Sequence, residues 1–229
     1  HENLFLEAGV KMEYCTLNLS AGPIYIGSNT EVMEGCMLRG PIAIGADSII
    51  KMGAKIYGPS TFGPGCRIGG EIARSIFFGN SNKAHDGYLG DSVLGEWCNL
   101  GADTNNSNLK NNYSEVKLWD YETERFEKTG QQFVGLIMGD HSKCAINTMF
   151  NTGTVVGAFA NVYGAGFPRN FIPDFSWGGP DGYRTYKFAE ACETAAIVMA
   201  RRGHVFNDLE KAILYHIYDR TARFRTWEK

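Results

Sequence analysis

The sequence predicts an all-β solenoid, a parallel β-helix built from six-residue repeats, on three observations. Bulky apolar residues recur at a fixed spacing of six at Ile26, Val32, Leu38, Ile44, Ile50, Ile56, Phe62 and Ile68. The same spacing returns at Met138, Cys144, Phe150, Val156 and Val162. Glycine often follows the periodic residue, where its backbone freedom suits a tight corner. One inward residue per short strand produces this period, which neither a helix nor a flat strand requires.

The first interruption of the repeat is expected after position 73. Residues 1–25 follow the pattern loosely and residues 26–73 follow it closely. At position 74 the ladder of apolar residues meets Arg74 instead. We therefore expect irregular chain from Ser75 to Gly87 and regular coil again from Tyr88.

A second interruption is expected over about 105–132. It is rich in asparagine and contains VKLWDYETERFEKTG at 116–130, in which strand-like ends flank a polar turn. This segment predicts a β-hairpin arm. Long loops inside a regular solenoid are more often functional than not. Regular coils are expected to resume from 134 and to continue to about 166.

The chain changes character after 166. Apolar stripes predict one helix over about Phe188–Arg202 and a second from an Asn207 cap to about Arg223. We expect the two helices to cap an open end of the β-helix, because exposed strand edges invite pairing. The predicted organisation is a β-helix domain over 1–166, followed by an extended segment and a two-helix cap over 167–229.

Composition excludes several classes of partner. The 229 residues carry a formal net charge of −3, which gives no bulk attraction to nucleic acid or to an anionic membrane. No apolar run is long enough to span a bilayer. The six cysteines are scattered without a CxxC pair, as in a cytoplasmic protein with reduced thiols. We expect a cytoplasmic chain with neither nucleic acid nor membrane as a partner.

The richest group of chemically capable residues reads NKAHDGYLGD at 82–91 and EWCNLGADT at 96–104. A histidine such as His85 can take a proton from an amine near neutral pH. A backbone N–H in the Gly101-Ala102 turn can donate to a developing oxyanion. His85 and Ala102 are therefore candidate catalytic residues, although a loop histidine with ordinary hydrogen bonds remains the alternative for His85.

The pattern HxxYLGD, followed one coil later by NxGAxT, resembles a known family. This is the acetyltransferase domain of the bacterial bifunctional N-acetylglucosamine-1-phosphate uridylyltransferase/glucosamine-1-phosphate N-acetyltransferases, which are hexapeptide-repeat acyltransferases. The resemblance is dense over 85–104 and coarse over the other coils. It implies a left-handed β-helix of a variant branch, with His85 as general base and with Tyr88 and Asn99 contacting the sugar phosphate.

The resemblance also implies further ligand contacts. Arg74 and Lys55 stand near the family's phosphate-binding lysine and arginine, and the arginine fork suits phosphate. Past GADT the chain departs from the family pattern. There the family has an asparagine and a tyrosine that hold acetyl-CoA and a lysine that holds the substrate, for which Asn108, Tyr113 and Lys110 are candidates. Largely backbone contacts to acetyl-CoA are expected at Ala145, Ile146 and Gly164.

The implied function is acetyl-CoA-dependent N-acetylation of glucosamine 1-phosphate to N-acetylglucosamine 1-phosphate, in the synthesis of UDP-N-acetylglucosamine. Acetyl-CoA is then a co-substrate. The family implies a homotrimer and a nucleotidyltransferase domain that precedes the β-helix and is missing here. Two alternatives remain open: transfer to another sugar, and a β-helical trimerisation or regulatory domain of a sugar-1-phosphate nucleotidyltransferase without acetyltransferase activity.

A zinc site of the carbonic-anhydrase kind is a further possibility raised by two loop histidines, His85 and His141. Such a site needs three protein ligands and an open fourth position. Only these two histidines lie in the expected coils. We therefore expect no metal in the site.

Overall fold

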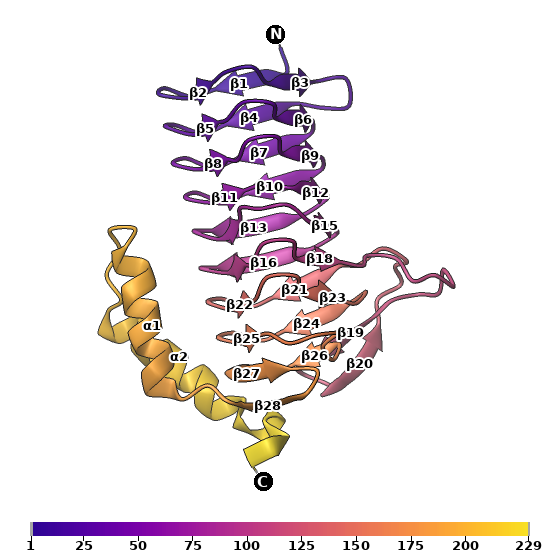
Figure 1. Cartoon of the computed structure of the whole chain (residues 1–229), viewed down its shortest axis with the longest axis vertical. Coiled ribbons are helices and arrows are strands. Elements are labelled where there is room, and N and C mark those ends of the chain that lie inside the picture. The colour runs from indigo at the N-terminus through magenta and orange to yellow at the C-terminus, as the bar shows by residue number, and fades with distance from the viewer. Residues whose placement is uncertain (1, 229) are drawn as a thin grey trace.

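The computed structural model describes residues 2–228 and shows a solenoid of short parallel strands, with three strands in each complete coil (Figure 1). The first strands of successive coils form sheet A, which contains β1 (Leu4–Leu6), β4 (Ile24–Ile26), β7 (Ile42–Ile44), β10 (Ser60–Phe62), β13 (Ile76–Gly79), β16 (Val93–Glu96), β21 (Leu136–Met138), β24 (Thr154–Val156) and β26 (Phe171–Ile172). The second strands form sheet B, which contains β2 (Lys11–Met12), β5 (Glu31–Val32), β8 (Ile49–Ile50), β11 (Arg67–Ile68), β14 (Asn82–Lys83), β17 (Asn99–Leu100), β22 (Lys143–Cys144), β25 (Asn161–Val162), β27 (Ser176–Gly179) and the antiparallel β28 (Gly182–Thr185).

The third strands form sheet C, which is divided into two parts. The first part contains β3 (Thr16–Asn18), β6 (Met37–Arg39), β9 (Lys55–Tyr57), β12 (Glu71–Ala73) and β15 (Tyr88–Gly90), and the second contains β18 (Asn105–Asn106) and β23 (Met149–Phe150). Between the parts, side-chain amides replace the backbone ladder. Asn105 Oδ1 accepts from the Tyr88 N–H at 2.8 Å, and Asn106 Oδ1 accepts from the Gly90 N–H at 2.8 Å. We call this division the amide seam.

The core confirms the predicted period. The inward residues from Ile26 to Ile68 are all buried, and burial of one such aliphatic side chain contributes about 1.5–3 kcal/mol. No helix among residues 2–228 combines the length and the apolar character that a membrane crossing requires. The structure therefore confirms a parallel β-helix with a hairpin arm and C-terminal helices.

The prediction of irregular chain over 75–87 is wrong, because β13 and β14 lie there and continue sheets A and B. The ladder changes for two physical reasons. The corner at Arg74 is short, with one left-handed residue at φ 46°, which shifts the spacing. The next inward positions are Phe77 and Lys83, and the second of these carries a polar side chain with no exposed surface.

The predicted hairpin arm is confirmed, with β19 (Lys117–Asp120) antiparallel to β20 (Arg125–Lys128). It packs against its own chain. The Trp119 ring stacks on Phe171 at 4.1 Å, and Tyr121 Oη donates to Asp174 Oδ2 at 2.8 Å. The β-helix also extends past the predicted boundary at 166, because β26 and β27 pair in parallel with β24 and β25.

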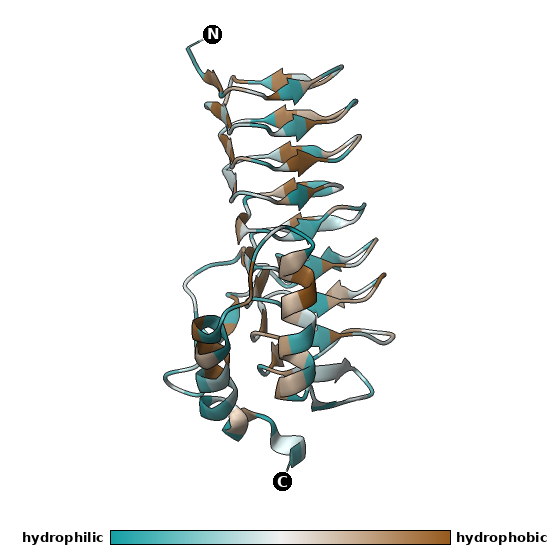
Figure 2. Ribbon diagram, turned by 90° about the vertical axis from the view of Figure 1, so that its left-hand side faces the viewer, coloured by the Kyte–Doolittle hydropathy of each residue, from teal (hydrophilic) through white to brown (hydrophobic). Residues whose placement is uncertain are grey.

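The C-terminal helices are α1 (Phe188–Ala200) and α2 (Asp208–Arg220), followed by short 3-10 turns at Ala222–Phe224 and Thr226–Glu228. The predicted capping box is present: Asn207 Oδ1 accepts from the Glu210 N–H, and Glu210 accepts from the Asn207 N–H. The pair does not cover an end of the solenoid as we expected. It lies along the flank of the later coils (Figures 1 and 2).

An aromatic column explains this position of the helices. Where sheet A turns into sheet B, successive corners carry left-handed residues, and in the later coils these are Trp97, His141, Phe159 and Phe175. Phe159 and Phe175 stack at 5.2 Å and form a second core with apolar residues of α1 and α2. The helices thus bury a stripe of aromatic corners.

Candidate active site

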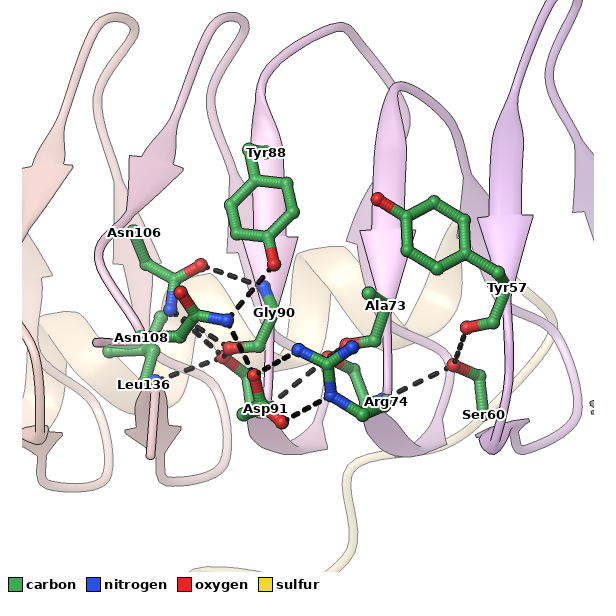
Figure 3. Close-up of polar contacts among 12 residues, drawn as sticks. Tyr57, Ser60, Ala73, Arg74, Tyr88, Gly90, Asp91, Asn106, Asn108 and Leu136 are labelled. Carbon is green, nitrogen blue, oxygen red and sulfur yellow. Dashed lines mark hydrogen bonds and ion pairs between the residues drawn. The ribbon is translucent and has the colours of Figure 1, made fainter. Parts of the chain in front are cut away.

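Arg74 and Asp91 occupy the corner between sheets C and A in successive coils. The Arg74 guanidinium donates from Nε to Asp91 Oδ1 at 2.7 Å and from Nη2 to Oδ2 at 2.8 Å (Figure 3). The hydrogen bond to Asp91 raises the pKa of Arg74, so the guanidinium stays charged. The Arg74 side chain remains 40% exposed, and its Nη1 takes no part in this fork. The corner therefore presents a fixed, charged arginine to a ligand.

Tyr88 and Asn108 join this pair from β15 and from the start of the long insertion. Asn108 Nδ2 donates to Tyr88 Oη at 3.0 Å and to Asp91 Oδ2 at 2.5 Å (Figure 3). Burial raises the pKa of Tyr88, so its phenol is neutral and can donate to a ligand. Asn108, which we expected beside acetyl-CoA, lies instead beside the predicted sugar-phosphate residues. We call Arg74, Tyr88, Asp91 and Asn108 the guanidinium cluster.

Lys55 lies on the same face, because Lys55 pairs in register with Glu71 and Glu71 pairs with Tyr88. These three side chains form an outward row on sheet C. The Tyr57 hydroxyl donates to the Glu71 carboxylate, and that bond raises the pKa of Tyr57 to about 12. Lys55 thus adds a second exposed cation to the face that carries the guanidinium cluster.

His85, Ala102 and Ile146 occupy equivalent corners between sheets B and C. The Asp103 N–H donates to the Asp86 carbonyl at 3.1 Å, and the Asn147 N–H donates to the Ala102 carbonyl at 2.8 Å. The corners are packed closely: a Cβ on Gly101 would lie 2.4 Å from the Ala145 carbonyl carbon. The corner that contains Gly164 follows β25, the next strand of sheet B. One column therefore aligns His85 with predicted acetyl-CoA contacts.

The His85 side chain is exposed, and within residues 2–228 its imidazole makes no hydrogen bond to another residue. The corner that contains His85 is instead stabilised through hydrogen bonds to its backbone carbonyls. Lys83 Nζ donates to the carbonyls of His85 and Asp86, the second at 2.8 Å. Burial lowers the pKa of Lys83 to about 8. We did not predict a role for Lys83 from the sequence, although a lysine six residues before Leu89 stands at a position of the apolar ladder.

Asn99 lies apart from Tyr88, because it starts β17 and faces outward from sheet B. Its Oδ1 accepts from Asn82 Nδ2 at 3.1 Å. The structure therefore divides the predicted sugar-phosphate residues of one chain between two faces. Arg74, Tyr88 and Lys55 lie on the side of sheet C, whereas Asn99 lies on sheet B.

Lys110 and Tyr113 lie in the insertion between β18 and the arm. Lys110 Nζ donates to the Glu115 carbonyl at 2.9 Å, so it braces the insertion. Tyr113 is 65% exposed. Lys110 also lines an open pocket of about 450 Å³ with asparagines 111, 112, 151 and 170. Within the described residues, no hydrogen bond or ion pair joins either side chain to the guanidinium cluster.

His141 belongs to the aromatic column. Its ring lies 4.5 Å from that of Phe159 and 6.1 Å from that of Trp97, in stacked orientations. Burial lowers the pKa of His141 to about 3. No group of three or more His, Cys, Asp and Glu side chains arranged to hold a metal occurs among residues 2–228. His141 therefore packs beneath the helices, away from the corner of His85.

The curated relatives of this chain include archaeal bifunctional proteins. The chain is 36% identical over 88 residues to the bifunctional protein GlmU of Methanocaldococcus jannaschii, which covers 38% of this chain and 21% of the relative. It is 33% identical over 93 residues to a bifunctional sugar-1-phosphate nucleotidylyltransferase/acetyltransferase of Sulfurisphaera tokodaii, over 41% of this chain and 23% of the relative. The matched segments thus span only about a fifth of the length of these relatives.

No protein-family model matches the chain. Among solved structures, LpxA from Bacteroides fragilis, a UDP-N-acetylglucosamine acyltransferase, aligns with 95% of this chain and 83% of its own, at 16% identity and a TM-score of 0.47. The resemblance predicted from HxxYLGD is confirmed, since over about two fifths of its length this chain is similar to bifunctional nucleotidyltransferase–acetyltransferases.

Proposed function

We propose that this chain transfers an acetyl group from acetyl-CoA to the amine of an amino-sugar phosphate, with glucosamine 1-phosphate as the acceptor. The observation that carries the proposal is the column of corners between sheets B and C. The corner that contains His85, whose side chain is exposed, is stacked by backbone hydrogen bonds on the corners of Ala102 and Ile146 in the next coils. A long, flexible acyl donor can lie along such a column and bring its thioester to the histidine.

The reaction assigns one task to each group. His85 takes a proton from the sugar ammonium or from the attacking amine, the nitrogen forms a bond to the thioester carbon, and the carbon–sulfur bond breaks to release the thiol. The backbone N–H of Ala102 is the candidate donor to the oxyanion. No covalent enzyme intermediate is needed when donor and acceptor bind together.

The guanidinium cluster supplies the acceptor site in this proposal. Arg74 offers its free Nη1 to the phosphate, and Tyr88 and Asn108 offer a hydroxyl and an amide to the sugar. Lys55 adds charge on the same face. Because Asn99 lies on sheet B, its predicted contact with the same sugar requires a second copy of the chain. This agrees with the homotrimer that the resemblance implies.

The test is release of free thiol from acetyl-CoA in the presence of glucosamine 1-phosphate, run beside His85→Ala. We expect turnover that falls by roughly 10²–10⁴ in the variant. Met52→Ala is a matched control, because Met52 is an exposed residue at the same corner two coils earlier. Turnover that is equal in the wild type and His85→Ala contradicts the assignment of the base.

Absence of turnover with a folded protein has two readings, and binding of acetyl-CoA separates them. Thermal stabilisation by millimolar acetyl-CoA indicates another acyl acceptor, because a ligand that binds the folded state must raise its stability. No stabilisation indicates the non-catalytic trimerisation or regulatory domain.

A further inference from the structure

A basic pocket lies between sheet B and the C-terminal end of α1. It has a volume of about 470 Å³, and we name it the sheet B pocket. Its cations are Arg67 and Lys143 from the sheet and Arg201 and Arg202 from the residues that follow α1. The other polar side chains of its lining are asparagines 80, 82 and 99 together with Cys98 and Trp97. Among the described residues, no aspartate or glutamate lines it.

Three of these cations are half-buried, and their hydrogen-bond partners are uncharged. Arg67 donates to the carbonyls of Asp47 and Gly65 at 3.0 and 3.2 Å, and Lys143 donates to the His141 carbonyl at 2.9 Å. Arg202 donates to Asn82 Oδ1 at 2.7 Å. Among residues 2–228, none of these side chains forms a salt bridge. These hydrogen bonds pair the N–H groups of the three cations with neutral oxygen atoms, so they do not neutralise the positive charges.

The sheet B pocket gathers four cations, although the whole chain has a net charge of −3. Burial, and then the neighbouring charges of Arg67 and Arg201, lower the pKa of Arg202. Desolvation also lowers the pKa of Lys143. Partly buried cations that repel one another are costly unless an anion joins them. An anionic ligand in the sheet B pocket would therefore offset the repulsion among these cations.

The shape and the donors indicate the class of anion. A pocket of this volume matches small-molecule sites rather than protein contacts. Arginine forks and a lysine are the usual partners of phosphate, and the Asn82–Asn99 amide pair can hydrogen-bond to an attached organic part. We propose that the sheet B pocket binds a phosphate-bearing small molecule, at a place separate from the guanidinium cluster of the same chain.

Two phosphate-bearing molecules of the proposed reaction fit these donors, namely coenzyme A and the amino-sugar phosphate. The choice of these two molecules is the only step that rests on the proposed function. Coenzyme A carries a pyrophosphate and a phosphomonoester, whereas an amino-sugar phosphate carries one phosphomonoester. Inorganic pyrophosphate serves as the minimal probe. Binding of pyrophosphate, coenzyme A and glucosamine 1-phosphate to the whole chain is measured by titration calorimetry at low and at physiological salt.

The variants are Lys143→Gln and Arg67→Gln, with Arg39→Gln as the control. Arg39 is an exposed arginine on β6, so the control removes the same charge far from the pocket in sequence and on another sheet. Arg202 is left intact because it ties the end of α1 to sheet B through Gly65 and Asn82. We expect pyrophosphate binding to weaken about tenfold or more in both pocket variants and to stay unchanged in Arg39→Gln.

The outcomes separate this proposal from the proposed function. Coenzyme A binding that weakens together with pyrophosphate identifies the acyl donor as the ligand, and parallel weakening of glucosamine 1-phosphate identifies the acceptor. Pyrophosphate binding that depends on Lys143, in a chain that does not acetylate glucosamine 1-phosphate, supports the pocket and contradicts the proposed function. No binding of any probe at millimolar concentration, or equal binding in all three variants, overturns the pocket even if acetyl transfer is found.

Discussion

Lys83 Nζ donates a hydrogen bond to the backbone carbonyl of His85, so a cation inside the β-helix holds the corner that carries the candidate base. The corners at 51–53, 101–103 and 145–147 in this column place a left-handed residue at their third position, at Gly53, Asp103 and Asn147. The His85 corner has its left-handed residue one position later, at Gly87. Lys83 thus stabilises an altered turn from within.

Lys83→Met is expected to keep the fold and lower kcat. Methionine fills an inward position of the ladder without a charge, but it cannot bind the His85 and Asp86 carbonyls. We expect kcat to fall about tenfold or more, with a smaller change in KM, because a displaced base acts on the chemical step. A changed histidine NMR titration in Lys83→Met shows the effect on His85 independently of turnover, and an unchanged titration contradicts the positioning role.

The pH dependence of Lys83 has a defined sign. Its pKa is lowered from 10.5 in the unfolded chain to about 8 in the fold, so between these values the unfolded state binds more protons. The free energy of unfolding of the wild type should therefore rise relative to that of Lys83→Met as the pH increases from about 8 to 10.5. Urea titrations of both proteins at pH 7 and pH 10 measure it. A constant difference would show that Lys83 does not titrate in this window.

Arg74→Gln is expected to raise KM for the sugar phosphate about tenfold, with a lesser effect on kcat. Glutamine cannot form the guanidinium fork with Asp91 or offer charge to a phosphate. The expected change in stability is small, about 0–1 kcal/mol, because the pair is partly exposed. Steady-state kinetics beside Arg39→Gln provide the check, and equal KM values for the two variants would remove Arg74 from the site.

Trp119→Ala should destabilise the chain by about 2–3 kcal/mol. Trp119 is half-buried, stacks on Phe171 and meets Phe126 and Phe224 edge to face. The arm is therefore part of the folded unit. Urea denaturation measures the loss, with the exposed Tyr113→Ala as control. A stability equal to that of the control would show that the arm packs loosely in solution.

His141→Phe should make the chain less sensitive to acid. The pKa of His141 is lowered to about 3 in the fold, so below about 6.5 the unfolded state binds a proton that the fold rejects. The wild type should lose stability relative to His141→Phe as the pH falls from 6.5 toward 3. Phenylalanine also removes the unpaired, buried Nδ1. Denaturation at pH 7 and pH 5, with the exposed His216→Phe as control, measures this difference.

The sequence was a sufficient guide to the fold wherever the inward residues were apolar. It failed at Lys83 and Asn106, because polar side chains on inward positions hide coils that are structurally regular. The motif gave His85 and Tyr88 as neighbours in sequence, but not the faces on which they lie. The position of Asn108 beside Tyr88 could not be predicted, because the path of an insertion depends on tertiary contacts such as this hydrogen bond.

The amide seam has a consequence for the cooperativity of the solenoid. Each coil of such a stack is stabilised by its neighbours through the strands that join them. At the seam, sheets A and B remain continuous while sheet C is joined by asparagine side chains in place of a backbone ladder. Tyr88 lies on one side of this joint and Asn108 on the other. A ligand that binds both residues would therefore couple the folding of two stacks of coils.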